Sequence, residues 1–493
     1  MIILNRISNF RYSFALSDKD GVRHVAKALT FTDPNIYAYN RKLEYFDKKK
    51  LTFSIGMLSN LKRYIVERGL KYTINDYEFK FPKGVKIDDR MEGKFIHQRK
   101  AVEAFFNRRF GIIKVPTRGG KTFIAAEIIR IFLNTEREGK VMFCVDNTTL
   151  FTQAVGDLKS FFERYGGIEI GEVRAGKKDF SNRVTVAMIQ TLQSVFRKPN
   201  NDKSRKEVEQ YLKNLRFLIV DEVHDNCSDS KLKLFKRCIR LNYQLCLSAT
   251  PYRSEAFVQN LKLQSWSGDI IYTITEESLR KRKVLSDYKV FELLIDHTEI
   301  DYPELSDDDY SELQKQLIFN SDIRNKILVK VIEIVQRLKL KTLVLFQSIE
   351  HGNNISRILD LPFISGVDKA QRREEVKQRF LAEEGGVLLA SNIFKKGVTL
   401  PACEILINTA ANVEAANTIQ KKGRVLGATE TKDRSLIIDF IDIYDAYFSE
   451  HSETRLETYI DAVGEKGVGI LDTSAEDCYE VLEKWIKKWF RIK

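Results

Sequence analysis

The 493-residue sequence is poor in several features that mark particular classes of protein. It has 8 prolines and 6 cysteines, and the cysteines are scattered, without a CxxC pair or a histidine at zinc-ligand spacing. We therefore expect neither a disulfide framework nor a zinc site, but reduced cysteines in a cytoplasmic protein. No uninterrupted apolar run reaches about 18 residues, so no membrane span is predicted. The N-terminus lacks a basic segment followed by a long apolar core, so no secretory signal is predicted.

Charge and length give the next constraints. Lysine and arginine number 81 against 68 aspartates and glutamates, a formal net charge of +13. A basic excess favours a polyanionic partner such as nucleic acid, but a merely solvated basic surface has the same composition. The chain is longer than one hydrophobic core supports, so we predict several domains.

Residues 1–85 form the first expected domain, a small α/β module rich in both basic and aromatic residues. Leu43–Tyr45 and Leu51–Ile55 are expected to be strands, and Gly56–Arg68 an amphipathic helix. Basic residues interleaved with aromatics suit DNA contact, although the aromatics also suit a core and the lysine run a solvated turn. The candidate DNA-contacting residues are Lys48, Lys49, Lys50, Lys62 and Arg63.

Two longer α/β domains are expected to follow. After a linker at Phe79–Asp89, strands and helices alternate over residues 86–285, with an exposed basic helix at Lys198–Lys213. A second alternating set spans residues 286–448. Such alternation predicts parallel sheets with helices on both faces. The remaining residues, 449–493, are charged and are expected to form a helical tail.

The segment VPTRGGKT, Val115–Thr122, lies between an apolar strand at Phe110–Val115 and a helix at Phe123–Leu133. This is the context of a phosphate-binding P-loop, in which backbone N–H groups and the helix N-terminus attract an anion. Lys121 is expected to reach the β- and γ-phosphates, and the Thr122 hydroxyl to ligate Mg²⁺. Val115 replaces the usual first glycine, and a chance turn is the alternative. The candidate nucleotide-binding residues of the loop are Pro116, Thr117, Arg118, Gly119, Gly120, Lys121 and Thr122.

Two further apolar strands end in polar residues that a P-loop enzyme needs. The strand in FLIVDEVHD ends in Asp221, expected to hold Mg²⁺, and Glu222, expected to activate the attacking water. The strand before LSATPYR ends in small hydroxyls that are placed to sense this acidic pair. We therefore expect His224, Ser248 and Thr250 to couple the nucleotide state to the rest of the lobe.

Together these segments resemble superfamily 2 helicases, whose remaining motifs follow in the family's order. FIHQRKAVEAF supplies Gln98, which resembles the adenine-reading glutamine of the family. Leu343–Gly352 is similar to motif IV, Ala390–Pro401 to motif V, and Gln420–Gly427 to motif VI. Through these matches, the resemblance also implies nucleotide-site roles for Gly397 and Gln420.

Two other segments, Val145–Gln153 and Val186–Leu192, look like DNA-contacting motifs of the family. Asp146 stands where proline is commoner in the first of them. The nucleic-acid contacts implied by the resemblance are Thr148, Gln153, Gln190, Thr191, Arg253 and Gln347.

Motif VI departs from the family pattern because its final arginine is replaced by Gly427. In the family, arginines of this motif reach the γ-phosphate from the second lobe, and such a contact contributes orders of magnitude in rate. Arg424 is the candidate arginine finger, and we expect it to suffice for hydrolysis. Lys421, Lys422 or Arg434 are alternative sources of the missing charge.

The resemblance implies two RecA-like lobes that bind ATP and Mg²⁺ between them and grip DNA by its backbone. It is nearest to the phage UvsW-type helicases, which unwind and branch-migrate forked and four-way DNA in replication, recombination and repair. The implied partners are branched or forked double-stranded DNA and single-stranded DNA, for a monomer in the cytoplasm of a host cell. An RNA helicase, a single-strand translocase and a nucleotide-gated DNA-binding scaffold with weak turnover are the alternatives.

Overall fold

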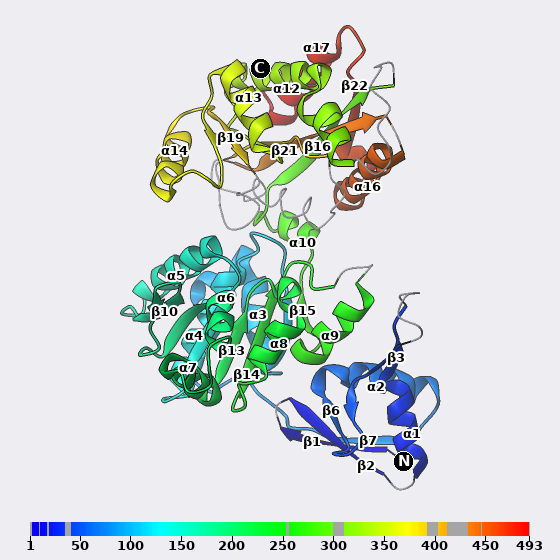
Figure 1. The fold of residues 1–493 in the computed structure, drawn as a ribbon, viewed down its shortest axis with the longest axis vertical. Helices are drawn as coiled ribbons and strands as arrows, with labels where there is room; N and C mark the ends of the chain where they lie inside the picture. Colours follow the sequence, from blue (N-terminus) through cyan, green and yellow to red (C-terminus); the bar gives the residue numbers. More distant parts are fainter. Residues whose placement is uncertain are drawn as a thin grey trace. The chain divides into compact units, whose positions relative to one another are not determined.

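The structure is a computed structural model. It describes residues 2–8, 10–16, 19–34, 41–252, 256–298, 310–391, 403–411, 432–444 and 446–492. Its contacts divide the chain into two units, residues 1–278 and 279–493 (Figure 1). The division falls within α10 (Glu276–Lys281), shortly before the boundary expected at residue 285. The first unit contains a five-stranded and an eight-stranded sheet, and the second a seven-stranded sheet, so the expected fold class is confirmed.

The N-terminal module is a sheet in the order β5-β6-β2-β1-β7, packed with α1 (Lys19–Ala28) and α2 (Leu58–Glu67) around one core. Tyr12 and Phe53 are buried in this core and stack with ring centroids 5.6 Å apart, so aromatic residues of the module serve packing. The strands are β1 (Ile2–Ser8), β2 (Arg11–Leu16), β5 (Phe46–Asp47), β6 (Thr52–Ser54) and β7 (Tyr72–Asn75), beside the separate pair β3 (Thr30–Thr32) and β4 (Lys42–Glu44).

A close backbone contact joins the module to the larger sheet of the same unit. A Cβ atom on Gly56 would lie 1.8 Å from the Gln264 carbonyl oxygen, so only glycine fits at this position. The Gln264 Nε2 donates to Ser59 Oγ and to Asp269 Oδ1, both at 3.0 Å. Polar side chains therefore fix the module against the turn that precedes β15.

The eight-stranded sheet has the order β11-β10-β12-β9-β13-β14-β8-β15 and is parallel except for the pair β10–β11. Its strands are β8 (Phe110–Lys114), β9 (Val141–Val145), β10 (Ile170–Arg174), β11 (Lys177–Lys178), β12 (Val184–Met188), β13 (Phe217–Val220), β14 (Tyr243–Ser248) and β15 (Ile270–Thr273). The central strands are apolar throughout because helices cover both faces.

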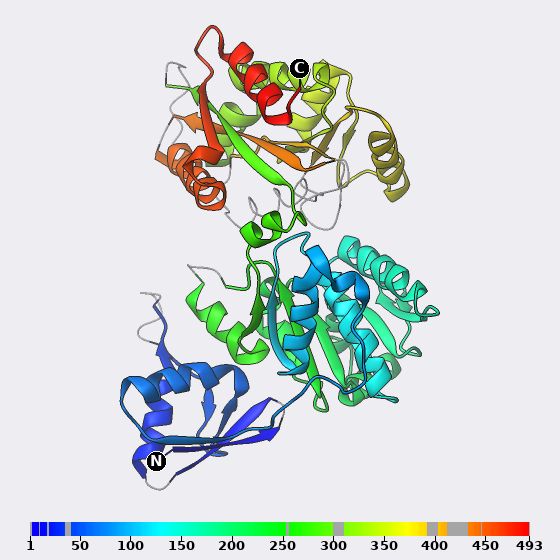
Figure 2. The same cartoon turned by 180° about the vertical axis from the view of Figure 1, so that it is seen from behind.

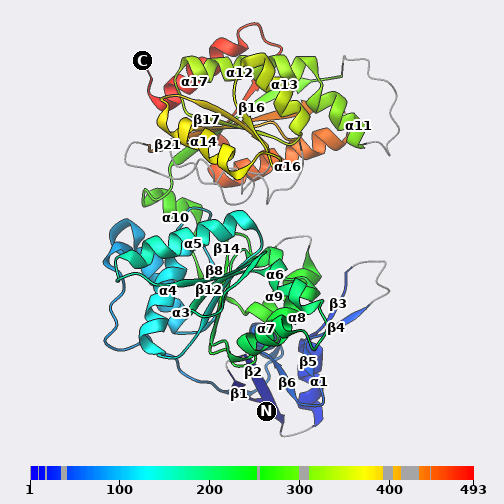
Figure 3. The same cartoon turned by 60° about the vertical axis from the view of Figure 1, so that its left-hand side comes forward.

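Two hydrophobic cores lie on opposite faces of this sheet (Figure 3). One contains α3 (Ile96–Phe106), α4 (Lys121–Thr135) and α5 (Thr148–Glu163). The other contains α6 (Ile189–Phe196), α7 (Lys203–Asn214), α8 (Asp229–Phe235) and α9 (Phe257–Ser267). The basic helix expected near residues 198–213 is α7.

The second unit is built on an all-parallel sheet in the order β18-β19-β17-β20-β21-β16-β22. Its strands are β16 (Asp287–Asp296), β17 (Thr342–Phe346), β18 (Phe363–Ile364), β19 (Val387–Ser391), β20 (Ile405–Asn408), β21 (Arg434–Ile443) and β22 (Val468–Asp472). Its helices include α11 (Tyr310–Gln314), α12 (Asp322–Arg337), α13 (Ile349–Leu359), α14 (Ala370–Ala382), α16 (Ala446–Val463) and α17 (Cys478–Phe490).

The segment after residue 449 is more than the helical tail that we expected. Between α16 and α17 it contributes β22, which pairs with β16 over five residues and forms an edge of the sheet (Figure 2). Leu482 and Ile486 of α17 are fully or almost fully buried in the core of the second unit. This segment is therefore an integral part of the second unit. No helix in the described part of the chain is both long and apolar enough to cross a membrane.

Candidate active site

Strand order brings the predicted site residues of the first unit to one edge of its sheet. Neighbouring strands β12, β9, β13, β14 and β8 are parallel, so their carboxyl ends lie side by side. The P-loop follows β8, the acidic pair follows β13, and Ser248 ends the strand between them. Residues predicted to contact DNA follow β9 and β12. Crevices at the carboxyl ends of parallel strands are where ligands bind in α/β sheets.

The P-loop has the geometry of a tight anion-binding turn. The Val115 N–H donates to Ser248 O at 3.1 Å, and the Gly119 N–H to Pro116 O at 3.0 Å, so the loop leaves the sheet and turns at once. Gly120 has φ +88° and lies directly before α4, which begins at Lys121. The backbone amides of the first turn of α4 therefore face the loop, where they favour a bound phosphate.

Gln98 lies against the P-loop. On α3, His97 Nε2 is 2.9 Å from Gly119 O, and Gln98 Nε2 donates to the same oxygen at 3.5 Å. Both side chains are buried. A Cβ on Gly120 would lie 2.2 Å from Gln98 Nε2, so the glutamine side chain packs directly against this glycine, whose positive φ favours glycine. The structure thus brings together the two segments that we expected to share one nucleotide.

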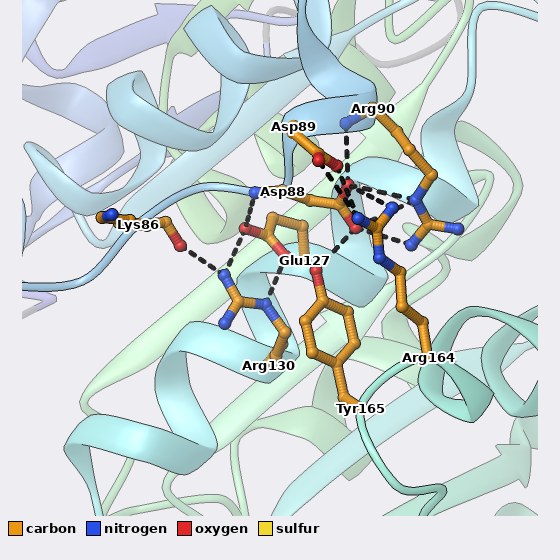
Figure 4. Close-up of polar contacts among 8 residues, drawn as sticks. All are labelled: Lys86, Asp88, Asp89, Arg90, Glu127, Arg130, Arg164 and Tyr165. Carbon is orange, nitrogen blue, oxygen red and sulfur yellow. Dashed lines mark hydrogen bonds and ion pairs between the residues drawn. The ribbon is translucent and has the colours of Figure 1, made fainter.

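The stretch that we expected to be a linker ends in a polar clamp on the P-loop helix (Figure 4). Glu127 of α4 is fully buried and accepts the Asp88 N–H at 2.8 Å, while Arg130 bonds both Glu127 oxygens at 2.7 Å. Arg130 also donates to Lys86 O at 2.6 Å. We call residues 86–95, which lead into α3, the strap. Side chains of α4 therefore hold one backbone donor and one backbone acceptor of the strap.

Asp88 is the second centre of this clamp. Its carboxylate accepts hydrogen bonds from Arg90 and, at 2.7 Å, from the Tyr165 hydroxyl beyond α5. Although burial opposes it, these donors hold the pKa of Asp88 far below its usual range. The strap runs through two short 3-10 turns into α3, so the clamp fixes the approach of Gln98 to the P-loop.

The two predicted catalytic carboxylates lie beside the P-loop lysine. Lys121 Nζ is 3.4 Å from Glu222 Oε1. Burial and the neighbouring Glu222 raise the pKa of Asp221 to about 7, against the opposing effects of Lys121 and of the Glu222 N–H. Glu222 has φ +43°, a left-handed conformation that costs free energy in a residue other than glycine. A strained backbone and an acid with a raised pKa at one point are typical of functional sites.

The predicted coupling residues also meet. His224 Nδ1 lies 2.9 Å from Ser248 Oγ, and the Thr250 N–H donates to the same hydroxyl at 3.0 Å. His224 and Ser248 are buried, and His224 Nδ1 is 3.5 Å from Glu222 Oε2. A short chain of contacts therefore runs from the acidic pair to the end of β14, the strand that separates it from the P-loop.

The predicted nucleic-acid residues of the first unit lie further along the same edge. Thr148 and Gln190 are exposed near the starts of α5 and α6, which follow β9 and β12. Gln153 and Thr191 lie one turn or one residue further into these helices and are partly exposed. In the N-terminal module, Lys48, Lys49, Lys50 and Arg63 are exposed and Lys62 is partly exposed, whereas Gln347 follows β17 in the second unit.

Two family models match the chain, one over most of the eight-stranded sheet and one over part of the seven-stranded sheet. The model described as the res subunit of type III restriction enzymes matches residues 94–253, and the helicase conserved C-terminal domain matches residues 320–428. The first match contains the P-loop, the acidic pair and the coupling residues. The chain is a superfamily 2 helicase.

The names and titles of proteins similar to this helicase mention both DNA and RNA. The DNA 3'-5' translocase XPB2 of Sulfurisphaera tokodaii is 24% identical over 82% of the chain and 93% of its own length. Among solved structures, Saccharomyces cerevisiae Dbp5 bound to RNA and ADP BeF3 has a TM-score of 0.54 at 14% identity, over 80% of the chain and 92% of its own. T4 UvsW matches 96% of the chain and 99% of its own at 16% identity, but its TM-score of 0.41 supports no inference.

The residues at the edge fit a magnesium–nucleotide complex. Glu222 Oε2 is buried without a hydrogen-bond partner among the described residues, which suits a site that a water or ligand completes. The described residues contain no group of three or more histidine, cysteine, aspartate or glutamate side chains that holds a metal unaided. Mg²⁺ typically binds one or two carboxylates together with substrate phosphates, so Thr122 and Asp221 are the residues that would hold it.

Several expectations fall outside the described residues and stay predictions. They concern Arg253, Gly397, Gln420 and Arg424, together with Lys421, Lys422 and Gly427. Arg434 can be judged, since it begins β21 and its guanidinium lies 4.9 Å from the Trp489 ring and donates to the Trp489 carbonyl. It lies at the amino end of its strand, which argues against the substitute role that we considered for it.

The sequence did not reveal the side chains that hold the main chain of the acidic pair. Asn226, Lys231 and Asp146 form a hydrogen-bonded chain between the ends of β13 and β9. The signal for Asp146 was its departure from the family's proline. Asn226 and Lys231 carry no comparable signal, because their role depends on side chains that meet only in the fold.

Proposed function

We propose that this helicase hydrolyses ATP at the carboxyl ends of the strands of its eight-stranded sheet. It uses the energy to move along DNA and to remodel branched or forked DNA. The observation that supports the proposal is that the catalytic residues and the nucleic-acid motifs lie at the carboxyl ends of neighbouring strands. Lys121 Nζ lies 3.4 Å from Glu222 Oε1, and the nucleic-acid motifs start from β9 and β12 on the same edge. The name of the archaeal relative, a DNA 3'-5' translocase, supports DNA as the track and 3′ to 5′ as the direction.

In this proposal each residue at the edge has a distinct task. Gln98 reads the adenine, the loop from Pro116 to Thr122 cradles the phosphates, and Mg²⁺ supplies charge neutralisation when bound. Glu222 orients the attacking water and accepts its proton. His224, Ser248 and Thr250 transmit the state of the acidic pair. Arg424 of the second lobe completes the site at the γ-phosphate, with Gln420 and Gly397 nearby.

DNA is held mainly at its backbone, by Thr148, Gln153, Gln190, Thr191, Arg253 and Gln347. The basic residues of the N-terminal module contact a second arm of a branched substrate. Backbone contacts predict weak sequence preference and an affinity that falls steeply with salt. The resemblance to UvsW-type helicases suggests forked and four-way DNA as the substrates of a monomer acting in replication, recombination and repair.

Two other functions have specific observations in their favour. The fold is similar to that of Dbp5 bound to RNA, and this similarity favours an RNA helicase as the first alternative. The replacement of the last motif VI arginine by Gly427 favours a nucleotide-gated scaffold with weak turnover.

One panel separates these functions. ATP hydrolysis is measured with single-stranded DNA, forked DNA, four-way DNA and duplex RNA at a fixed salt concentration, with Lys121→Ala as the control. We expect the largest stimulation with branched DNA and none in the control. Greater stimulation by RNA would overturn the proposed substrate, and negligible turnover with intact ATP-dependent DNA binding would favour the scaffold.

The arginine finger is tested separately, because its failure leaves the motor intact. Arg424→Ala is expected to lower DNA-stimulated hydrolysis by roughly 10³-fold while ATP still binds. Full activity of this variant would show that another residue stabilises the γ-phosphate.

A further inference from the structure

Lys231 of α8 occupies an unusual position between two motifs of the first unit. Its Nζ donates to Asp146 Oδ1 at 2.8 Å, to Asn226 Oδ1 at 2.9 Å and to Asp225 O at 3.0 Å. Its side chain is 15% exposed and that of Asp146 is 20% exposed. The ammonium group thus uses its three donors on one acceptor beside β9 and two beside β13.

Asn226 continues this chain to the acidic pair. It is fully buried, and its Nδ2 donates to Asp221 O at 3.0 Å and to Glu222 O at 3.1 Å. The amide orientation is unambiguous, because two carbonyls require the nitrogen on one side and the lysine requires the oxygen on the other. These bonds hold the main chain where Glu222 adopts its left-handed conformation.

At its other end the chain reaches a nucleic-acid motif. Asp146 lies directly before Asn147, whose side chain caps α5 by accepting the Leu150 N–H at 2.9 Å. Thr148, the first residue of α5, is a proposed nucleic-acid contact. Asp146 replaces the proline common at this position in the family, and proline has no side-chain acceptor for Lys231.

We propose that Lys231 is a positioning residue that couples nucleic-acid binding at the start of α5 to the conformation of Glu222. The path runs through Asp146 on one side and Asn226 on the other, and the inference rests on the proposed function. A movement of residues 146–148 on contact with nucleic acid shifts Lys231, and through it Asn226, because hydrogen bonds link the three side chains. Because Asn226 holds the carbonyls of Asp221 and Glu222, the general base shifts into or out of line with the water.

The test compares hydrolysis with and without nucleic acid in Lys231→Met, Asp146→Ala and the double variant. We expect stimulation by forked DNA to fall at least tenfold in each, with basal hydrolysis and DNA affinity within about threefold of wild type. The double variant should lose no more than either single one, because all three interrupt the same path. Lys233→Met, an exposed neighbour on the same helix, is the matched control and should behave as wild type.

Each other outcome overturns the proposal. Equal loss of basal and stimulated hydrolysis in Lys231→Met, or a lowered unfolding midpoint that accounts for the loss, would mean a structural role. Undiminished stimulation, or additive losses in the double variant, would show that coupling takes another route while the motor assignment stands. If wild type is stimulated by neither DNA nor RNA, the proposed function fails together with this inference.

Discussion

The first lobe contains the eight-stranded sheet and the second lobe the seven-stranded sheet. Carboxylates near strand ends have opposite pKa shifts in the two lobes. In the first, Asp221 and Glu222 share Lys121 as their nearby cation, and the pKa of Asp221 rises to about 7. In the second, Asp442 bonds Arg324 Nε at 2.9 Å and His297 Nε2 at 3.2 Å, and these partners outweigh burial to hold its pKa at about 2.

Asp439, on the same strand as Asp442, also has hydrogen-bond donors and a cation around its carboxylate. It accepts the Tyr459 hydroxyl at 2.7 Å and the Asn408 amide at 2.8 Å, with Arg455 Nε 3.6 Å away. Asp439 and Asp442 are thus compensated by partners within the chain. Glu292, which pairs with Asp439 in the sheet, differs: its buried Oε1 has no hydrogen-bond partner among the described residues, and burial and Asp439 raise its pKa. Asp221 and Glu222 are left under-compensated, as expected where a bound metal ion supplies the missing positive charge.

The largest expected effect is on the chemical step. Glu222→Gln removes the general base, so we expect hydrolysis at saturating DNA to fall about 10³-fold. ATP binding, measured by equilibrium titration, should persist because Lys121 and the P-loop are intact. Glu169→Gln, an exposed carboxamide substitution in the same unit, serves as the control. A Glu222→Gln protein with more than a tenth of wild-type activity would remove Glu222 from its role.

The next effect concerns the fully compensated acids. Asp442→Asn leaves the Arg324 guanidinium buried without its counter-charge, so the second unit should lose about 3 kcal/mol of unfolding free energy. Urea denaturation monitored by the tryptophans of α17 measures this, with exposed Asp433→Asn as the control. A loss below about 1 kcal/mol would mean that this ion pair is not the compensation we describe.

The two acids should also give opposite pH dependences of stability in the absence of nucleotide. A carboxyl group with a raised pKa costs stability as its proton is lost, so Asp221 should destabilise the protein progressively from about pH 4 to about pH 7. Asp442 contributes stability above about pH 4 that is lost as the pH falls towards 2.

Comparison of wild type with Asp221→Asn isolates the first effect. The variant should be the more stable by about 1–2 kcal/mol at pH 8, after allowance for solvent screening, and the difference should shrink as the pH falls to 5. Unfolding midpoints across this range measure it. A difference that does not change with pH would contradict the raised pKa.

The smallest effect is expected at the link between the acidic pair and β14. Ser248→Ala removes the hydroxyl that contacts His224 and accepts the Thr250 N–H, at a cost of about 1 kcal/mol in stability. Base pairs unwound per ATP should fall more than the hydrolysis rate. An unchanged ratio would mean that this serine supports the fold and not the coupling.

The sequence was informative where a local pattern decides the outcome. The order strand, glycine turn, Lys-Thr and helix led to the P-loop, and DEVH after an apolar strand led to the acidic pair. Alternating strands and helices led to two parallel sheets. Each of these depends on residues that are neighbours in the chain, so spacing alone carries the information.

Features that depend on distant partners could not be predicted. Glu127 meets Asp88 from 39 residues away, and Lys231 meets Asp146 from 85 residues away. The strand β22 is only five residues long and does not alternate polar with apolar residues. Its pairing with β16 therefore could not be predicted from the sequence either. Arg424 lies outside the described residues, so its place in the site stays a prediction.

We expect Mg²⁺, bound together with the nucleotide, to supply the positive charge that the first lobe does not place beside Asp221. Titration calorimetry at pH 6.5, with a non-hydrolysable ATP analogue and excess Mg²⁺ in buffers of different ionisation enthalpy, measures the protons released on binding. We expect wild type to release a substantial fraction of one proton and Asp221→Asn to release almost none. Equal proton release by both proteins, or none by wild type, would contradict it.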